Sequence, residues 1–123
     1  MRRVAIAALL AAIALGAAGP ASAEAPTKLG VRADEWSLLL TRPSVSPGDA
    51  EIQYQNAGED PHDLQIRRRG SKRVHSIAEL EPEGVAELGL HLRRDSRYVM
   101  WCSTLDGTHR ALGMEAELRV KRR

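Results

Sequence analysis

The sequence predicts an all-β protein, folded as an antiparallel β-sandwich of about seven strands. Three observations favour this fold class. Short runs alternate apolar and polar residues, which is the pattern of strands that bury one face. Turn signals rich in Gly, Pro, Asn and Asp separate these runs at intervals of about ten residues. After residue 23, no run has the apolar spacing of a convincing amphipathic helix.

The first 23 residues are expected to be a leader and not part of the folded domain. Two arginines precede an uncharged apolar run, 4–18, and Ala21-Ser22-Ala23 has the small residues of a cleavage site. We therefore predict a secretory signal peptide, 1–23, and a mature domain, 24–123. The apolar run is short for a transmembrane span, so an uncleaved membrane anchor is the less favoured alternative. Two arginines alone leave the export route, general or twin-arginine, open.

A cleaved leader places the domain in the periplasm or outside the cell. The full chain carries 18 Lys+Arg and 16 Asp+Glu, and the leader holds two of the arginines and no acid, so the mature domain has 16 of each. This balance gives no support to a nucleic-acid partner. The remaining 100 residues suffice for one hydrophobic core. We expect a monomer without a stable membrane span after cleavage.

The first part of the mature domain alternates between strand-like runs and turns. Residues 24–30 are expected to be a flexible N-terminus, and residues 31–40, with Trp36 and three consecutive leucines, predict one or two short strands. A Ser-Pro-Gly-Asp turn follows at 46–49. Residues 50–55 then alternate apolar and polar side chains, which predicts a strand with one buried face.

The next strand carries a histidine at its first position. His62 shares the alternation phase of Leu64 and Ile66, so its side chain is expected to point inward. A basic turn, Arg67–Arg73, follows this strand. Runs of like charge are commonly solvated loops. The functional alternative is a docking surface for an acidic redox partner or an anionic surface.

The second half of the domain ends in two strands that flank a long loop. Residues 85–92 place three leucines on one face, which predicts a strand, while 74–83 is expected to be a loop with a strand or a helical turn. Tyr98, Met100 and Cys102 share a strand face, and the last strand follows Met114. His75 and His91 are expected to be ordinary surface residues.

The loop between the last two strands brings together an unusual set of side chains. Cys102 is the only cysteine, His109 follows after six intervening residues, and Met114 follows after four more. A lone thiol in an oxidising compartment is open to oxidation unless it is buried or bound to metal. Thiolate, imidazole and thioether together favour copper, and two His, one Cys and an axial Met form the blue-copper site. His62 is the candidate second histidine.

These residues resemble those of the cupredoxins, including the exported plastocyanin-like and azurin-like blue copper proteins. The similar segments are Pro47-Gly48, the NAGEDPHD stretch and the C-terminal WCSTLDGTHRALGMEAELRV. The resemblance implies a Greek-key β-sandwich with one copper ion near one end. Its ligand positions match His62, Cys102, His109 and Met114, so copper would cycle there between the cuprous and cupric states.

The resemblance also implies roles for neighbouring residues. Asp63 follows the first histidine, where the family commonly has a polar residue that braces the ligand loop, and Asn56 lies in the turn before it. The family uses the solvent-facing edge of the second histidine as an electron port. His109 would be this port here, with Ala111 and Leu112 as its apolar patch. The gap of six residues between Cys102 and His109 is longer than usual in the family.

The function expected from these features is that of an exported one-electron carrier, not an enzyme. Its partners would be redox proteins that dock at the His109 end or at the basic turn. The main alternative is a copper chaperone or buffer that transfers the metal without carrying electrons. A metal-free binding domain and a thiol enzyme that uses Cys102 with His109 are weaker alternatives. Zinc is less suited to the site because structural zinc prefers four Cys or His ligands.

Overall fold

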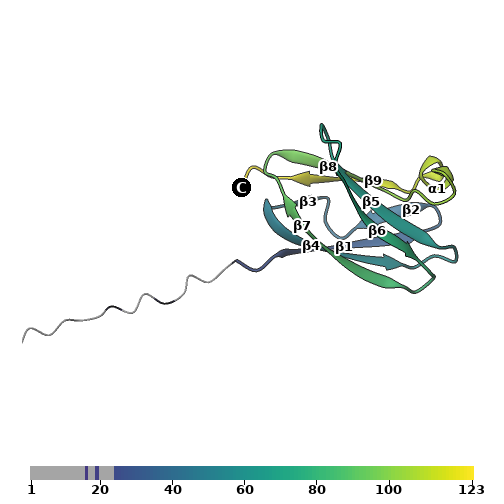
Figure 1. Cartoon of the computed structure of the whole chain (residues 1–123), viewed down its shortest axis with the longest axis horizontal. Coiled ribbons are helices and arrows are strands. Elements are labelled where there is room, and N and C mark those ends of the chain that lie inside the picture. The colour runs from purple at the N-terminus through teal and green to yellow at the C-terminus, as the bar shows by residue number, and fades with distance from the viewer. Residues whose placement is uncertain (1–15, 17–18, 20–23) are drawn as a thin grey trace, which may run out of the picture.

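Nine strands and one short helix form the part of the chain that the computed structural model describes, which is Gly16, Gly19 and residues 24–123 (Figure 1). The predicted signal peptide and its cleavage site fall in 1–23 and lie, apart from those two glycines, outside the described residues. The elements are β1 (Thr27–Asp34), β2 (Ser37–Leu40), β3 (Ser44–Val45), β4 (Gly48–Asn56), β5 (His62–Arg68), β6 (Val74–Leu80), β7 (Val85–Leu92), β8 (Ser96–Trp101), α1 (Thr108–Leu112) and β9 (Glu115–Val120).

The strands form two sheets, which confirms the predicted all-β sandwich. The first sheet has the order β2-β1-β4-β7, and the second has the order β3-β9-β8-β5-β6. Most neighbouring strands are antiparallel, but β1 pairs with β4 in parallel and β3 pairs with β9 in parallel. After β2 the chain crosses to the second sheet and forms β3. It then returns to the first sheet as β4, which lies beside β1 in the parallel direction. The sheets are therefore mixed and contain nine strands, where the sequence predicted about seven antiparallel ones.

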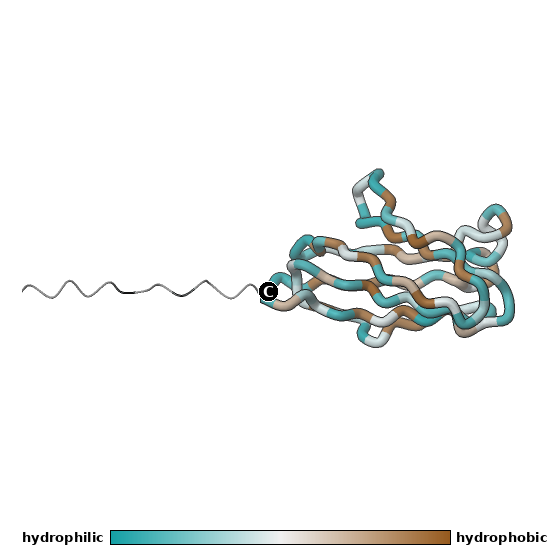
Figure 2. Tube along the Cα trace, turned by 60° about the horizontal axis from the view of Figure 1, so that its bottom comes forward, coloured by the Kyte–Doolittle hydropathy of each residue, from teal (hydrophilic) through white to brown (hydrophobic). Residues whose placement is uncertain are grey.

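The core lies between the two sheets and follows the alternation seen in the sequence. On β4, Ala50, Ile52 and Tyr54 point inward and are buried, while the residues between them face outward. On β5, Leu64 and Ile66 are fully buried. Figure 2 shows the same alternation as hydrophobic and hydrophilic positions along the strands. Burial of these apolar side chains is the main contribution to the stability of the sandwich.

Strand register brings the predicted ligand positions to one end of the sandwich. On either side of β8, Trp101 pairs with Gln65 of β5 and Glu115 of β9, so the chain that follows Trp101 emerges beside the start of β5. The helix α1 lies at this end, which we call the α1 end (Figure 1). The opposite end, where β1 starts and β9 finishes, is called the tail end. Among the described residues, no helix is long and apolar enough to cross a membrane.

Two segments differ from the expected secondary structure. β1 begins at Thr27, within the stretch predicted to be flexible, because residues 27–33 pair along their length with β4. The predicted loop between the last two strands contains the five-residue helix α1. A helix of barely more than one turn has too few residues to produce a recognisable apolar period.

The core position Ile52 provides a test of this packing. The Ile52→Ala substitution should lower the free energy of unfolding by about 2–5 kcal/mol, because a fully buried side chain would leave a cavity between the sheets. The matched control is Val85→Ala on the neighbouring strand β7, where the side chain is 70% exposed and the change should stay within about 0.5 kcal/mol. Urea unfolding of both variants measures the difference, and equal losses would contradict the assigned core.

Candidate metal centre

Three potential metal ligands from separate segments converge at the α1 end. His62 opens β5, Cys102 follows β8, and His109 lies in α1. All three side chains are buried. The two histidine Nδ1 atoms lie 3.1 Å apart, and the Cys102 Sγ atom lies 3.8 Å from Nδ1 of His62 and 3.7 Å from Nδ1 of His109. The structure thus brings together three of the four ligands predicted from the sequence.

The spacing of these atoms fits a single metal ion. The point equidistant from the two nitrogens and the sulfur lies about 2.1 Å from each of them. Bonds from a metal to imidazole nitrogen are about 2.0–2.1 Å long, and bonds to thiolate sulfur are about 2.3 Å long. The donor set of two imidazoles and one thiol is also one that soft and borderline metals select. The arrangement therefore fits a trigonal metal site without a large movement of the side chains.

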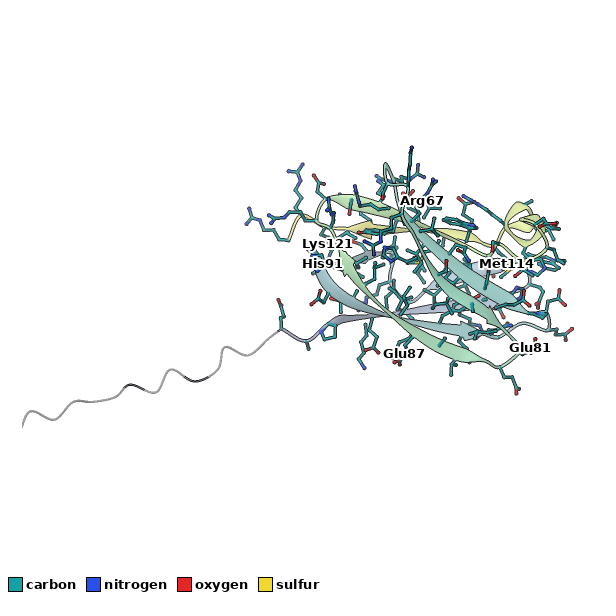
Figure 3. All side chains as sticks on the ribbon, in the orientation of Figure 1. Arg67, Glu81, Glu87, His91, Met114 and Lys121 are labelled. Atoms are coloured by element: carbon teal, nitrogen blue, oxygen red, sulfur yellow. The ribbon has the colours of Figure 1, made fainter. Side chains whose placement is uncertain are left out.

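Met114, the fourth predicted ligand, is held next to the cysteine by the backbone. The Cys102 amide donates a hydrogen bond to the Met114 carbonyl oxygen at 3.1 Å, and the Met114 side chain is fully buried. Figure 3 shows Met114 at the α1 end of the sandwich. Gly113, before it, has a φ of 129°, and a Cβ there would lie 2.8 Å from the Trp36 carbonyl oxygen. Glycine therefore allows the chain to pass close to Trp36 before it enters β9.

Asp63 joins the segments that carry His62 and Cys102. Its Oδ1 atom accepts a hydrogen bond from the Ser103 amide at 2.6 Å, and its Oδ2 atom accepts one from the Ser103 hydroxyl. The Tyr54 hydroxyl donates to the Asp63 carbonyl oxygen at 2.9 Å across the interior of the sandwich. Asp63 itself follows His62, and its side chain thus connects this segment to the residue after Cys102.

Asn56 organises the loop that leads to His62. Its side chain is fully buried and uses both ends of its amide. The Nδ2 group donates to the carbonyl oxygens of Asp60 and Leu80 at 2.8 and 2.9 Å, and Oδ1 accepts from the Gly58 amide at 2.9 Å. The amide therefore satisfies backbone groups of the β4–β5 loop and of β6, which pairs with β5 at His62.

The residue that orients His62 was not predicted from the sequence. Glu35, in the turn between β1 and β2, lies with its Oε1 atom 2.7 Å from Nε2 of His62. The same carboxylate accepts hydrogen bonds from the Glu59 and Asp60 amides at 2.9–3.0 Å. These contacts, led by the Asp60 amide, lower the pKa of Glu35 to about 2. A Cβ on Gly58 would lie 2.3 Å from the carboxylate, so glycine makes room for it.

The Glu35 contact determines the tautomer of His62. An ionised carboxylate only accepts hydrogen bonds, so Nε2 of His62 must be the donor. In the neutral imidazole the proton is then on Nε2, which leaves the lone pair of Nδ1 free and directed at Cys102 and His109. This is the form of histidine that binds a metal through Nδ1.

Trp36, next to Glu35, covers the second histidine. The rings of Trp36 and His109 lie edge to face with centroids 4.8 Å apart. His109 is only 1% exposed, and its Nε2 atom is buried without a hydrogen-bond partner among the described residues. The prediction that the His109 ring edge faces solvent is therefore wrong, because the turn between β1 and β2 covers it. Trp36 (38% exposed), Ala111 and Leu112 (52% exposed) form the surface here, which we call the Trp36 patch.

The environment of the sulfur is apolar with a few polar contacts. Burial raises the pKa of the Cys102 thiol. Hydrogen bonds lower it, and they come from the Thr104 hydroxyl and from the backbone amides of Thr104 and Asp63. The Thr104 Oγ1 atom lies 3.2 Å from the sulfur. Burial thus protects the thiol from solvent oxidants, and the nearby donors are placed to stabilise a thiolate.

Comparison with known proteins finds solved structures with a similar fold. No family model and no curated protein matches the chain. Auracyanin A, a "blue" copper protein from the green thermophilic photosynthetic bacterium Chloroflexus aurantiacus, superposes with a TM-score of 0.63 at 11% identity, over 79% of this chain and all of that chain (100%).

Two further solved structures have the same fold. The reduced auracyanin of Roseiflexus castenholzii has a TM-score of 0.62 at 15% identity, over 79% of this chain and 98% of that one. Auracyanin B has a TM-score of 0.62 at 15% identity, over 81% and 93% of the two chains. This likeness confirms the cupredoxin-type sandwich that was predicted from the sequence.

Asn56 offers a test of how the loop before His62 is held. The Asn56→Ala substitution should lower the free energy of unfolding by at least about 2 kcal/mol, because two carbonyl groups and one amide would lose their partner. The neighbouring exposed residue provides the control, since Gln55→Ala should change the stability by less than about 0.5 kcal/mol. Thermal and urea unfolding of the metal-free protein measure both, and a neutral Asn56→Ala variant would refute the assigned role.

Proposed function

We propose that the domain binds one copper ion through His62, Cys102, His109 and Met114 and acts as a one-electron carrier. The observation that carries this proposal is the convergence of two Nδ1 atoms and one Sγ atom, all buried, around a point about 2.1 Å from each. The Cys102 thiolate and the two imidazoles would be the strong ligands, and the thioether of Met114 would be a weaker one. The fold shared with the auracyanins supports the same assignment.

Copper, when bound, supplies a one-electron couple between its cuprous and cupric states. The protein's part is to keep the ligands in one arrangement for both states. Glu35 holds His62, and Asp63 joins the segments of His62 and Cys102. A frame that fixes the ligands in this way reduces the rearrangement that accompanies loss or gain of an electron. Burial of the ligand side chains also keeps water out of the site.

The Trp36 patch is the proposed route for electrons between the site and a partner. Trp36 contacts the His109 ring on one side and reaches solvent on the other. Ala111 and Leu112 extend this exposed apolar surface from α1. An apolar area above a buried site suits brief docking of another redox protein. The port therefore consists of Trp36 in front of His109, and not of an exposed His109 ring.

The burial of the ligands favours an electron carrier over a copper chaperone or buffer. A chaperone must transfer its ion to an acceptor, which is easier when at least one ligand is accessible from outside. Here Cys102, His62 and Met114 are fully buried, and Trp36 lies over His109. Release of an ion would require the turn between β1 and β2 to move away.

We also propose that the domain acts outside the cytoplasm after removal of residues 1–23. The sequence of that segment supports export, and the one cysteine of the chain is placed in the site and not in a disulfide. A buried thiol bound to a metal is compatible with an oxidising compartment. The periplasm and the extracellular space both fit this assignment.

The visible spectrum of the copper-loaded protein tests the proposed site. A copper(II)–thiolate bond should give an intense absorption band at about 600 nm. Cys102→Ser should abolish this band, because serine cannot form the charge-transfer bond to copper. His75→Gln, which alters a histidine outside the site, should retain it. If the copper-loaded wild-type protein has no such band, the blue-copper assignment is wrong.

Glu35 should influence the reduction potential of the bound copper. In Glu35→Gln the hydrogen bond to His62 can persist, but the negative charge is lost, so the cupric state should become less stable and the potential should rise. A selective tenfold loss of cupric affinity corresponds to about 59 mV. Glu81→Gln makes the same charge change at the α1 end without contact to the ligands (Figure 3). Voltammetry that gives equal shifts for both variants would contradict this role.

A further inference from the structure

Charged side chains are distributed unequally between the two ends of the sandwich. The mature domain has equal numbers of acidic and basic residues, but the loops at the α1 end are mostly acidic and those at the tail end are mostly basic. The acidic loops carry Glu59, Asp60, Glu81, Glu83 and Asp106. The basic segments are 67–73, 93–94 and 121–123. Figure 3 shows Lys121 and His91 at the end opposite Met114 and Glu81.

A cleft of about 480 Å³ lies among these basic segments. It lies between the turn that joins β5 to β6 and the turn that joins β7 to β8. Among the residues that the structure describes, no carboxylate lines it. The lining side chains and backbone come from Arg68, Ser71, Arg73, His75, Gly89, Leu90, His91, Arg93 and Tyr98. A concave surface with several cations and no acid is suited to an anionic group.

The three guanidinium groups of the cleft differ from other arginines of the domain. Arg32, Arg97 and Arg110 each lie within 3 Å of a carboxylate oxygen. Within the part of the chain that the structure describes, Arg68, Arg73 and Arg93 have no carboxylate within 4.0 Å. Their charges are therefore not neutralised inside the domain and remain available for a ligand. Guanidinium groups bind phosphate oxygens with two parallel hydrogen bonds.

The place of the cleft in the chain indicates which anion it meets. Glu24 lines a depression that shares His91 with the cleft, so the chain enters the domain beside it. The uncharged apolar run at 4–18 is only five residues from Glu24 in the sequence. While the leader is still attached and its apolar run lies in a bilayer, the tail end of the domain is at the headgroup level, so removal of 1–23 releases the domain with this end beside the membrane surface. The basic tail 121–123 follows β9 at the same end.

We propose that the tail end binds the phosphate headgroups of an anionic membrane surface through Arg68, Arg73 and Arg93. Each Lys or Arg near such a surface contributes about 1 kcal/mol of attraction, so the three together exceed thermal energy several-fold. The acidic loops of the α1 end are repelled by the same surface. The domain is thus held with the Trp36 patch directed toward solvent. This binding does not depend on the proposed copper site and applies equally to the metal-free protein.

Co-sedimentation of the metal-free full chain with vesicles tests the proposal. The vesicles are phosphatidylcholine alone or phosphatidylcholine mixed with phosphatidylglycerol. Phosphatidylglycerol should strengthen the binding, and added salt should weaken this increase. The triple variant Arg68→Gln, Arg73→Gln and Arg93→Gln should bind on the order of 100-fold more weakly, which corresponds to about 1 kcal/mol for each charge. Replacing the same three residues by lysine should retain most of the binding.

A matched control separates the cleft from net charge and from the leader. Arg32→Gln, Arg67→Gln and Arg110→Gln remove three charges outside the cleft from the same full chain, and this variant should bind nearly as well as the wild type. Equal binding of the two glutamine variants would overturn the proposal, since the leader or the total charge would then account for attachment. Saturable binding of inorganic phosphate or polyglutamate without binding to vesicles would overturn it in favour of a soluble anion or an acidic protein.

Discussion

The feature on which the rest of the site depends is the hydrogen bond between the Glu35 carboxylate and Nε2 of His62. It places the proton on Nε2 and leaves Nδ1 unprotonated beside the Cys102 sulfur and His109. The carboxylate is held ionised by two backbone amides of the loop before His62. Without such a partner, a fully buried imidazole next to a second imidazole would have no defined tautomer or orientation.

The topology of the sandwich makes this contact possible. β1 and β4 run side by side in parallel, so the turn after β1 and the loop after β4 leave the sheet at the same end. Glu35 and Trp36, adjacent in the first of these segments, contact His62 and His109 respectively. The second sheet brings the end of β8 and the start of β9 to the same place. The candidate ligands thus come from segments attached to strands of the second sheet, while Glu35 and Trp36 contact them from the first sheet.

The sequence was sufficient to predict the sandwich and the convergence of His62, Cys102 and His109, because both follow from strand alternation and from spacing within one loop. Strand alternation placed His62 on the inner face, and one loop contained Cys102 and His109. The contact of Glu35 was not predictable, since it depends on a parallel pairing between distant strands that leaves no local signal. The family resemblance implied an exposed His109 ring edge, whereas Trp36 from the turn between β1 and β2 covers it. Acidic residues in turns are common, so nothing marked Glu35 as a site residue.

X-ray absorption at the copper edge, recorded for both oxidation states of the loaded protein, measures directly whether His62, Cys102 and His109 bind the copper ion. We expect two nitrogen ligands at about 2.0 Å and one sulfur ligand at about 2.3 Å in both states, with only small changes between them. This result would agree with a preformed site in which His62, Cys102 and His109 keep their positions. A site with only nitrogen and oxygen ligands, or one that loses its sulfur on oxidation, would contradict it.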